Sequence, residues 1–140
     1  NRAREVLKGK KNVELQWGNA ENLKLPNEFF DKVICSETLE HTPHPRKVME
    51  EIHKILKNNG LQIIRVQYEK RAQFIMKIAK ILLLNKILGV CRTEEKYEWH
   101  LHWADKKFII DISKGLFEIK KIHRFPPIIG YHFIATLIKK

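Results

Sequence analysis

The stretch from residue 30 to residue 67 constrains the fold most, because it predicts a strand, a helix and a second strand in succession. Phe30 to Cys35 ends in a run of apolar residues, a pattern typical of a buried strand in a parallel sheet. Pro45 to Lys57 predicts a helix, and Leu61 to Gln67 predicts the next strand. Such a unit returns the second strand parallel to the first through a right-handed crossover. We therefore expect an α/β domain built around a parallel sheet.

The predicted helix has recognisable ends and one apolar face. Pro45 suits the first helical position, where its missing N–H group would have had no partner. Asn58-Asn59-Gly60 predicts a left-handed stop after Lys57. The apolar face that we expect to pack on the sheet consists of Val48, Met49, Ile52, Ile55 and Leu56.

Apolar periodicity also predicts the elements on either side of this unit. Before it, Arg2 to Lys8 reads as the end of a helix that Gly9 stops, and the alternating residues Val13 to Trp17 read as a strand. After it we expect helices over Lys70 to Leu84 and Asp105 to Lys114, and strands over Phe117 to His123 and Tyr131 to Ile138. The last two strands are expected to pair as a hairpin. No linker or repeat divides the sequence, so residues 1–140 are expected to form a single domain.

The net charge and the cysteine content bear on the location of the protein and on the ligands it can attract, but they do not identify a binding partner. The chain carries 27 Lys and Arg against 16 Asp and Glu, a net charge of +11. Such a surface can attract RNA, DNA or anionic lipid, but the lysines are scattered, which is typical of solvated helix faces. Cys35 and Cys91 match no CxxC or zinc spacing, so we expect a reduced, cytoplasmic location.

Four short motifs occur in a fixed order along the chain. They read Gly18-Asn19-Ala20-Glu21-Asn22-Leu23-Lys24-Leu25-Pro26, Phe30-Asp31-Lys32-Val33, Leu39-Glu40-His41 and Leu56-Lys57-Asn58-Asn59-Gly60. In this order and spacing they resemble the class I S-adenosylmethionine-dependent methyltransferases of the small-molecule and quinone/sterol type. The resemblance is firm from Asn12 to Val66 and looser toward the C-terminus. It implies a Rossmann-like α/β sheet, mostly parallel, with a C-terminal antiparallel hairpin.

The resemblance also implies a set of residues that bind the cofactor S-adenosylmethionine. Asn19 stands where the family has an acidic residue that contacts adenine; an amide can both donate to and accept from an adenine edge. Ala20 and Glu21 are expected to line the same edge. Cys35 and Ser36 stand where the family's strand end faces the methionine part of the cofactor.

Two further family elements would precede the segment seen here. In the family, a glycine-rich loop follows the first strand, because the backbone must pass close to the ligand, and an acidic residue after the second strand holds the ribose. The strand predicted over Val13 to Trp17 resembles the family's third. We therefore expect a sheet that lacks its first strands, in a chain that is the C-terminal portion of a longer methyltransferase. Alone, this chain is predicted to bind the cofactor poorly.

His41 is the candidate catalytic residue, because a histidine titrates near neutrality and can take a proton from a substrate hydroxyl or amine. The alternative is that Glu40 and His41 shape the loop and cap the following helix. His100 and His102, with Trp99 and Trp103, lie on the expected substrate side, where they line a pocket or simply pack. No ligand spacing supports a metal site built from His41, His44, His100 and His102, so we predict none.

The predicted function is methyl transfer from S-adenosylmethionine to an oxygen, nitrogen or carbon atom of a small-molecule or lipid-like acceptor. The Lys70 to Leu84 helix carries Lys70, Gln73, Lys77 and Lys80 on one face. Its apolar side either rests on a membrane and admits a lipid-like acceptor, or packs over the site as a lid.

Two other classes of protein remain open at this point. One is a catalytically inactive, methyltransferase-like binding module. The other is an RNA-directed methyltransferase, which the net charge of +11 suggests. Against it, the Asn-Pro-Pro-Tyr type of tetrapeptide common in amino-directed nucleic-acid enzymes is replaced here by Cys35-Ser36-Glu37-Thr38.

Overall fold

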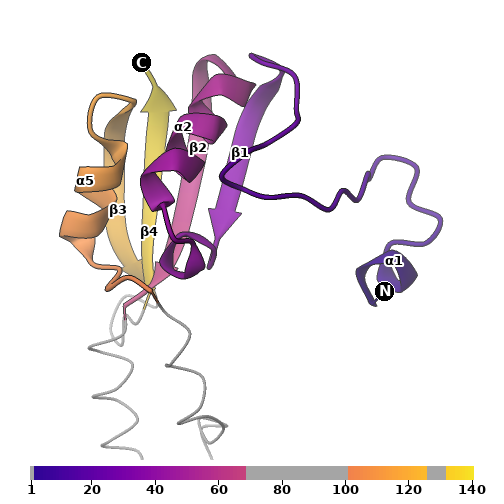
Figure 1. The fold of residues 1–140 in the computed structure, drawn as a ribbon, viewed down its shortest axis with the longest axis horizontal. Coiled ribbons are helices and arrows are strands. Elements are labelled where there is room, and N and C mark those ends of the chain that lie inside the picture. The colour runs from indigo at the N-terminus through magenta and orange to yellow at the C-terminus, as the bar shows by residue number, and fades with distance from the viewer. Residues whose placement is uncertain (1, 69–100, 126–131) are drawn as a thin grey trace, which may run out of the picture.

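The computed structural model describes residues 2–68, 101–125 and 132–140 (Figure 1). The described elements are α1 (Arg2–Val6), β1 (Phe30–Ser36), the short 3-10 helix η1 (Leu39–His41), α2 (Pro45–Ile55), β2 (Leu56–Gln67), α5 (Lys106–Ser113), β3 (Phe117–Phe125) and β4 (His132–Lys139). The helix predicted over Lys70 to Leu84 lies outside the described residues, as do Cys91, Trp99 and His100.

The four described strands form one sheet in the order β1-β2-β4-β3. β1 and β2 pair in parallel, whereas β4 pairs antiparallel with β2 on one side and with β3 on the other. β1, β2 and β3 therefore run in one direction, and β4 runs in the opposite direction. The predicted α/β sheet with an antiparallel C-terminal strand pair is confirmed.

Both long helices lie on the same face of the sheet (Figure 1). Alternate residues of β2 face them and are buried, including Ile64 and Val66, and α2 contributes the apolar face that the sequence predicted. The fully buried apolar residues between sheet and helices include Leu39, Val48, Met49, Leu56, Ile64, Val66, Ile109, Ala135 and Leu137. On the opposite face of the sheet, Ile34 remains 70% exposed, so the buried run predicted at the end of β1 is wrong at this residue. The core of the described residues therefore lies between one face of the sheet and α2 with α5.

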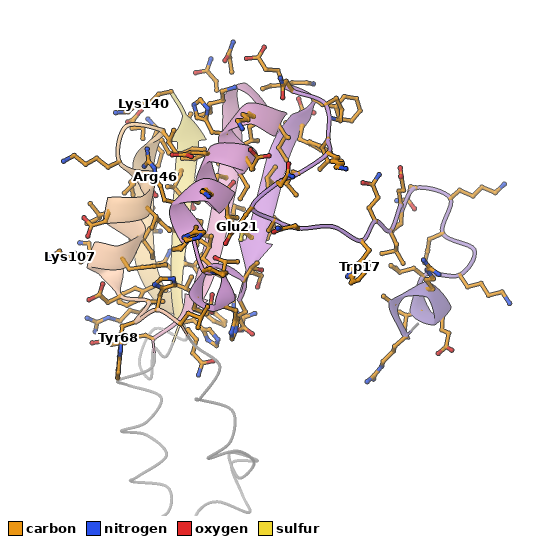
Figure 2. The ribbon with its side chains drawn as sticks, viewed as in Figure 1. Trp17, Glu21, Arg46, Tyr68, Lys107 and Lys140 are labelled. Carbon is orange, nitrogen blue, oxygen red and sulfur yellow. The ribbon has the colours of Figure 1, made fainter. Side chains whose placement is uncertain are left out.

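Arg46 ties α2 to α5, although the two helices are far apart in the sequence (Figure 2). Its Nη1 atom donates to the carbonyl oxygens of Ile112 at 3.0 Å and Lys114 at 2.6 Å. These carbonyls belong to the end of α5, where a helix leaves its last C=O groups without intrahelical partners. The guanidinium at the start of α2 therefore caps the end of α5.

The boundary between α2 and β2 differs from the prediction. The helix ends at Ile55 rather than Lys57, because Leu56 already has an extended backbone and pairs with Phe30 of β1. The predicted stop at Asn58-Asn59-Gly60 was therefore wrong as a helix end. Asn59 does adopt a positive φ of 62°, but it does so within β2, next to an irregularity in the β1–β2 register.

The lack of space around position 60 of β2 requires a glycine there. A Cβ atom at this position would lie 2.7 Å from the carbonyl oxygen of Lys57 and 2.9 Å from Cδ2 of Leu56. The first of these contacts is with main-chain atoms, which cannot rotate away. Gly60, the last residue of the motif from Leu56 to Gly60 that follows α2, is therefore required for packing.

The strand predicted over Val13 to Trp17 is absent from the structure, which corrects that prediction. The segment has no ladder of hydrogen bonds, and the Trp17 side chain is fully exposed, away from the sheet (Figure 2). Alternating apolar residues become a strand only beside a partner that supplies the ladder, and no described strand lies next to this segment.

Two predicted helices are confirmed, each slightly shorter than expected. The first helix spans Arg2–Val6, and Gly9 follows it with a φ of 84°. α5 begins after Asp105, whose side chain accepts a hydrogen bond from the Phe108 amide at 2.8 Å. Among the described helices, none has the length and apolar character needed to cross a bilayer.

The Gly60→Ala variant is expected to lower the free energy of unfolding by about 1–3 kcal/mol, because the added methyl group must displace main-chain atoms. The measurement is urea unfolding followed by circular dichroism. Gly18→Ala is the matched control, since a Cβ there meets nothing within 4 Å. Equal stabilities of the two variants would contradict the packing argument.

Candidate functional site

The parallel strands β1 and β2 end at the same edge of the sheet, at the bottom of Figure 1. In an open α/β sheet, ligands bind beyond this carboxyl edge. Residues 37–42 leave β1 here, Gln67 and Tyr68 end β2, and residues 101–102 return to the same place through main-chain hydrogen bonds to Glu40. These segments form the candidate site.

Glu40 holds these segments together from a buried position. Its side chain is 1% exposed, and Oε1 accepts a hydrogen bond from the Gln67 amide at 3.2 Å. Its carbonyl oxygen accepts from the amides of Leu101 at 2.8 Å and His102 at 3.3 Å. Its second carboxylate oxygen, Oε2, has no hydrogen-bond partner among the described residues. These contacts support the structural alternative for Glu40, which shapes the loop.

His41 is exposed, as a residue that exchanges a proton with a ligand must be. It closes η1, and its amide donates to the Thr38 carbonyl oxygen at 3.0 Å. This turn presents the imidazole at the carboxyl edge of the sheet. A catalytic role for His41 stays a prediction.

His102 packs against its surroundings. Its Nε2 atom lies 2.9 Å from the carbonyl oxygen of Thr42, and its ring stacks on Phe108 with centroids 5.8 Å apart. A carbonyl oxygen only accepts, so Nε2 carries the proton and donates. The packing alternative therefore fits His102. Within the described part of the chain, no group of three or more His, Cys, Asp or Glu side chains is placed to hold a metal ion.

The loop that carries Asn19 is closed by its own hydrogen bonds. The Asn19 side-chain oxygen accepts from the Glu21 amide at 2.9 Å, and its carbonyl oxygen accepts from the Asn22 amide at 3.0 Å. The side-chain NH₂ group of Asn19 is therefore the part of the amide that faces outward as a donor. A hollow of about 530 Å³ runs along this loop. It is lined by Gln16, Trp17, Gly18, Asn19, Ala20, Asn22, Leu23, Lys24 and Leu25.

Two carboxylates anchor the same loop to α2. Oε1 of Glu21 accepts from the His44 amide at 2.8 Å, just before the helix begins, and Oε2 of Glu51 accepts from the Leu23 amide at 2.9 Å. Figure 2 shows Glu21 between the loop and the helix. A negative charge is favourable at a helix N-terminus. The structure thus joins the predicted adenine-side residues to the segment that follows His41, and it gives Glu21 a structural partner.

Cys35 and Ser36 end β1 with opposite exposures. The Cys35 side chain is buried in the core, where burial raises the pKa of its thiol to about 11 and the charge of Glu40 adds to the effect. The thiol is therefore protonated near neutral pH, and only the main chain of Cys35 reaches the edge. The Ser36 side chain is exposed there. Their contacts with a cofactor stay predictions.

A second cluster lies at this edge, and the sequence did not predict it. It consists of Glu37, Arg65 and His132, and we call it the Glu37 cluster. Oε1 of Glu37 lies 3.0 Å from Arg65 Nη2 and 2.9 Å from His132 Nε2. The three residues come from the end of β1, from β2 and from β4, so only the strand register brings them together. The one signal in the sequence was Arg65, the single charged residue of the second half of β2.

Comparison with known proteins finds similarity to methyltransferases. Residues 1–64 match the model of a methyltransferase domain. The chain is 38% identical over 53 residues to the uncharacterised methyltransferase YcgJ of Bacillus subtilis, a match that covers 38% of this chain and 21% of that protein. It is 28% identical over 110 residues to a ubiquinone biosynthesis O-methyltransferase of Glaesserella parasuis, covering 76% and 41%. The chain thus spans less than half the length of these relatives.

Solved structures agree with this result. An S-adenosylmethionine-dependent methyltransferase of Thermotoga maritima superposes with a TM-score of 0.65 at 21% identity, over 99% of this chain and 70% of that one. The predicted resemblance is confirmed: residues 1–64 match the methyltransferase domain model, and the chain has the fold of class I S-adenosylmethionine-dependent methyltransferases.

The Glu21→Ala variant is expected to lower the free energy of unfolding by about 0.5–2 kcal/mol, because the hydrogen bond at the start of α2 is lost. Urea unfolding measures this change. Glu14→Ala serves as the control, since the Glu14 carboxylate contacts the exposed side chain of Gln16 two residues away. An unchanged stability of Glu21→Ala would contradict an anchoring role.

The raised pKa of Cys35 predicts slow alkylation. In a Cys91→Ser background, iodoacetamide at about pH 8 should modify Cys35 roughly 100-fold more slowly than free cysteine, because the thiolate is the reacting form. The rate should rise about tenfold per pH unit up to about pH 10 as the thiolate fraction grows. Mass spectrometry measures the rate, with the urea-unfolded protein as control. A rate that levels off below about pH 9 would contradict the prediction.

Proposed function

We propose that the protein containing this chain transfers a methyl group from S-adenosylmethionine to a small-molecule acceptor. The observation that carries the proposal is the carboxyl edge of β1 and β2, where Ser36 and His41 are exposed and where a hydrogen bond from the His44 amide to Glu21 holds the loop that carries Asn19. This edge falls within the residues that match the methyltransferase domain. The Thermotoga maritima protein with the same fold is described as dependent on S-adenosylmethionine.

The residues at the edge fit the cofactor. The outward NH₂ group of Asn19 can donate to an adenine nitrogen, and the hollow beside Asn19 and Ala20 offers the room. The Ser36 hydroxyl and the main chain of Cys35 can contact the polar methionine end. The sulfonium of the cofactor supplies an activated methyl group, so the chain mainly has to align the two reactants.

His41 is proposed to accept the proton that an acceptor hydroxyl or amine loses. Its exposed imidazole at the end of η1 is the titratable group best placed for this at the described edge. An acceptor related to quinones is proposed because one relative is a ubiquinone biosynthesis O-methyltransferase. Peripheral membrane contact through residues 70–84 and a cytoplasmic location are proposals from the sequence, and that segment lies outside the described residues.

Calorimetric titration of the complete natural protein with S-adenosylmethionine tests the cofactor. We expect binding, and we expect Asn19→Leu to weaken it about tenfold, because one hydrogen bond to the ligand is lost. Asn12→Leu is the control, since Asn12 is also exposed but lies outside the loop. Absence of binding by the unaltered protein would refute the proposal.

Transfer of a radiolabelled methyl group to hydroxylated quinones tests the acceptor. His41→Gln is expected to lower kcat about 100-fold while leaving cofactor affinity unchanged, because only the proton acceptor is removed. His44→Gln, a nearby exposed histidine, provides the control. A kcat that is unchanged in His41→Gln would remove this residue from the mechanism.

A further inference from the structure

Glu37 adopts a backbone conformation that a residue with a side chain rarely takes. Its φ is 49°, in the left-handed region that favours glycine. The residue follows Ser36 directly, so this turn sets the direction in which the chain leaves β1. A strained residue of this kind persists only where its surroundings hold it, and such residues cluster at functional sites.

Three hydrogen bonds hold Glu37 in this conformation. Its amide donates to the Arg65 carbonyl oxygen at 2.8 Å, and its carboxylate accepts from the Arg65 guanidinium at 3.0 Å and from His132 Nε2 at 2.9 Å. The strand register brings Glu37, Arg65 and His132 close together, because Ser36 pairs with Arg65 across β1 and β2, while His132 pairs with Gln67 across β2 and β4. Both partners of Glu37 lie on strands of the sheet.

The charges of the cluster agree with this arrangement. Burial lowers the pKa of His132, and the Arg65 charge acts in the same direction, against the opposing effects of Glu37 and Glu40. His132 stays in contact with the cluster in either tautomer, because its Nε2 atom lies 2.9 Å from Glu37 Oε1, which accepts, and 3.1 Å from Arg65 Nη2, which donates. The Glu37 carboxylate balances the Arg65 guanidinium, so loss of either charge leaves the other mismatched.

We propose that Arg65 and His132 are positioning residues that hold residues 36–42 through Glu37, in the geometry that the ligand needs. This role of Arg65 and His132 rests on the proposed function of the site. Both candidate residues lie in this segment: Ser36 directly precedes the strained turn, and His41 is the last residue of η1. Contacts of Glu40 and Thr42 hold the C-terminal end of this segment. The Glu37 cluster holds its N-terminal end.

A double-mutant cycle on the complete natural protein tests the role of Arg65. Arg65→Met and Glu37→Gln should each weaken binding of S-adenosylhomocysteine about tenfold, and the double variant should bind no more weakly than either single variant. Arg65→Lys should recover part of the affinity, since an ammonium group keeps the charge. Additive losses in the double variant would overturn the proposal.

Lys57→Met is the matched control. Lys57 forms an ion pair with Asp31 at 2.8 Å, between the same two strands but at their opposite end. Its loss should leave affinity within about twofold, and both variants should shift the urea midpoint by less than about 0.5 M, because half-exposed ion pairs stabilise little. An equal loss of affinity in Lys57→Met and Arg65→Met would reduce the cluster to a general structural role.

Hydrogen exchange separates this inference from the proposed function, because it needs no ligand. Arg65→Met should raise the exchange rate of the amides of residues 37–42 at least about fivefold relative to Lys57→Met, since the strained turn loses its restraint. Unchanged exchange in these residues would overturn the inference whether or not the protein binds the cofactor. Faster exchange without ligand binding would refute the proposed function alone.

Discussion

The parallel pairing of β1 with β2 is the constraint on which the rest of the structure depends. It aligns Cys35 with Ile64 and Ser36 with Arg65, so one edge of the sheet receives the segments that follow both strands. The same alignment turns Ile64 and Val66 toward α2 and α5, where they are fully buried. A slip of one residue would exchange the two faces and place Arg65 in the apolar core. Hydrophobic burial therefore fixes the register, and the register assembles the site.

Acidic side chains at this edge serve mainly to hold the backbone. Glu40 joins the ends of two strands and residues 101–102, Glu21 and Glu51 fasten the preceding loop to α2, and Glu37 turns the chain after β1. Each carboxylate accepts a hydrogen bond from a main-chain amide or from a cation. Ser36, His41 and Asn19 are among the described residues whose side chains are exposed here. An edge whose carboxylates hold the backbone suits a reaction in which alignment of two reactants matters more than strong acid or base chemistry.

The sequence predicted those features whose cause is local. The apolar face of α2, the helix that begins after Asp105 and the strand that begins at Phe30 depend on neighbouring residues, and all are present. Features that depend on a partner were predicted wrongly or not at all. Leu56 is strand rather than helix because Phe30 lies beside it, and Val13 to Trp17 has no strand beside it among the described residues. The Glu37–His132 contact joins residues 95 positions apart, which periodicity cannot detect.

The cap that Arg46 places on the end of α5 has a consequence for how the chain can vary. Because α2, α5 and β2 are fastened to one another directly, the stretch between Tyr68 and Leu101 closes a loop whose two ends are already held. Doubling the length of such a loop costs only about 0.6 kcal/mol in closure entropy. Insertions, deletions and substitutions in this stretch of related chains therefore cost little free energy of folding. The frame of sheet and helices stays constant while the length and sequence of this stretch change.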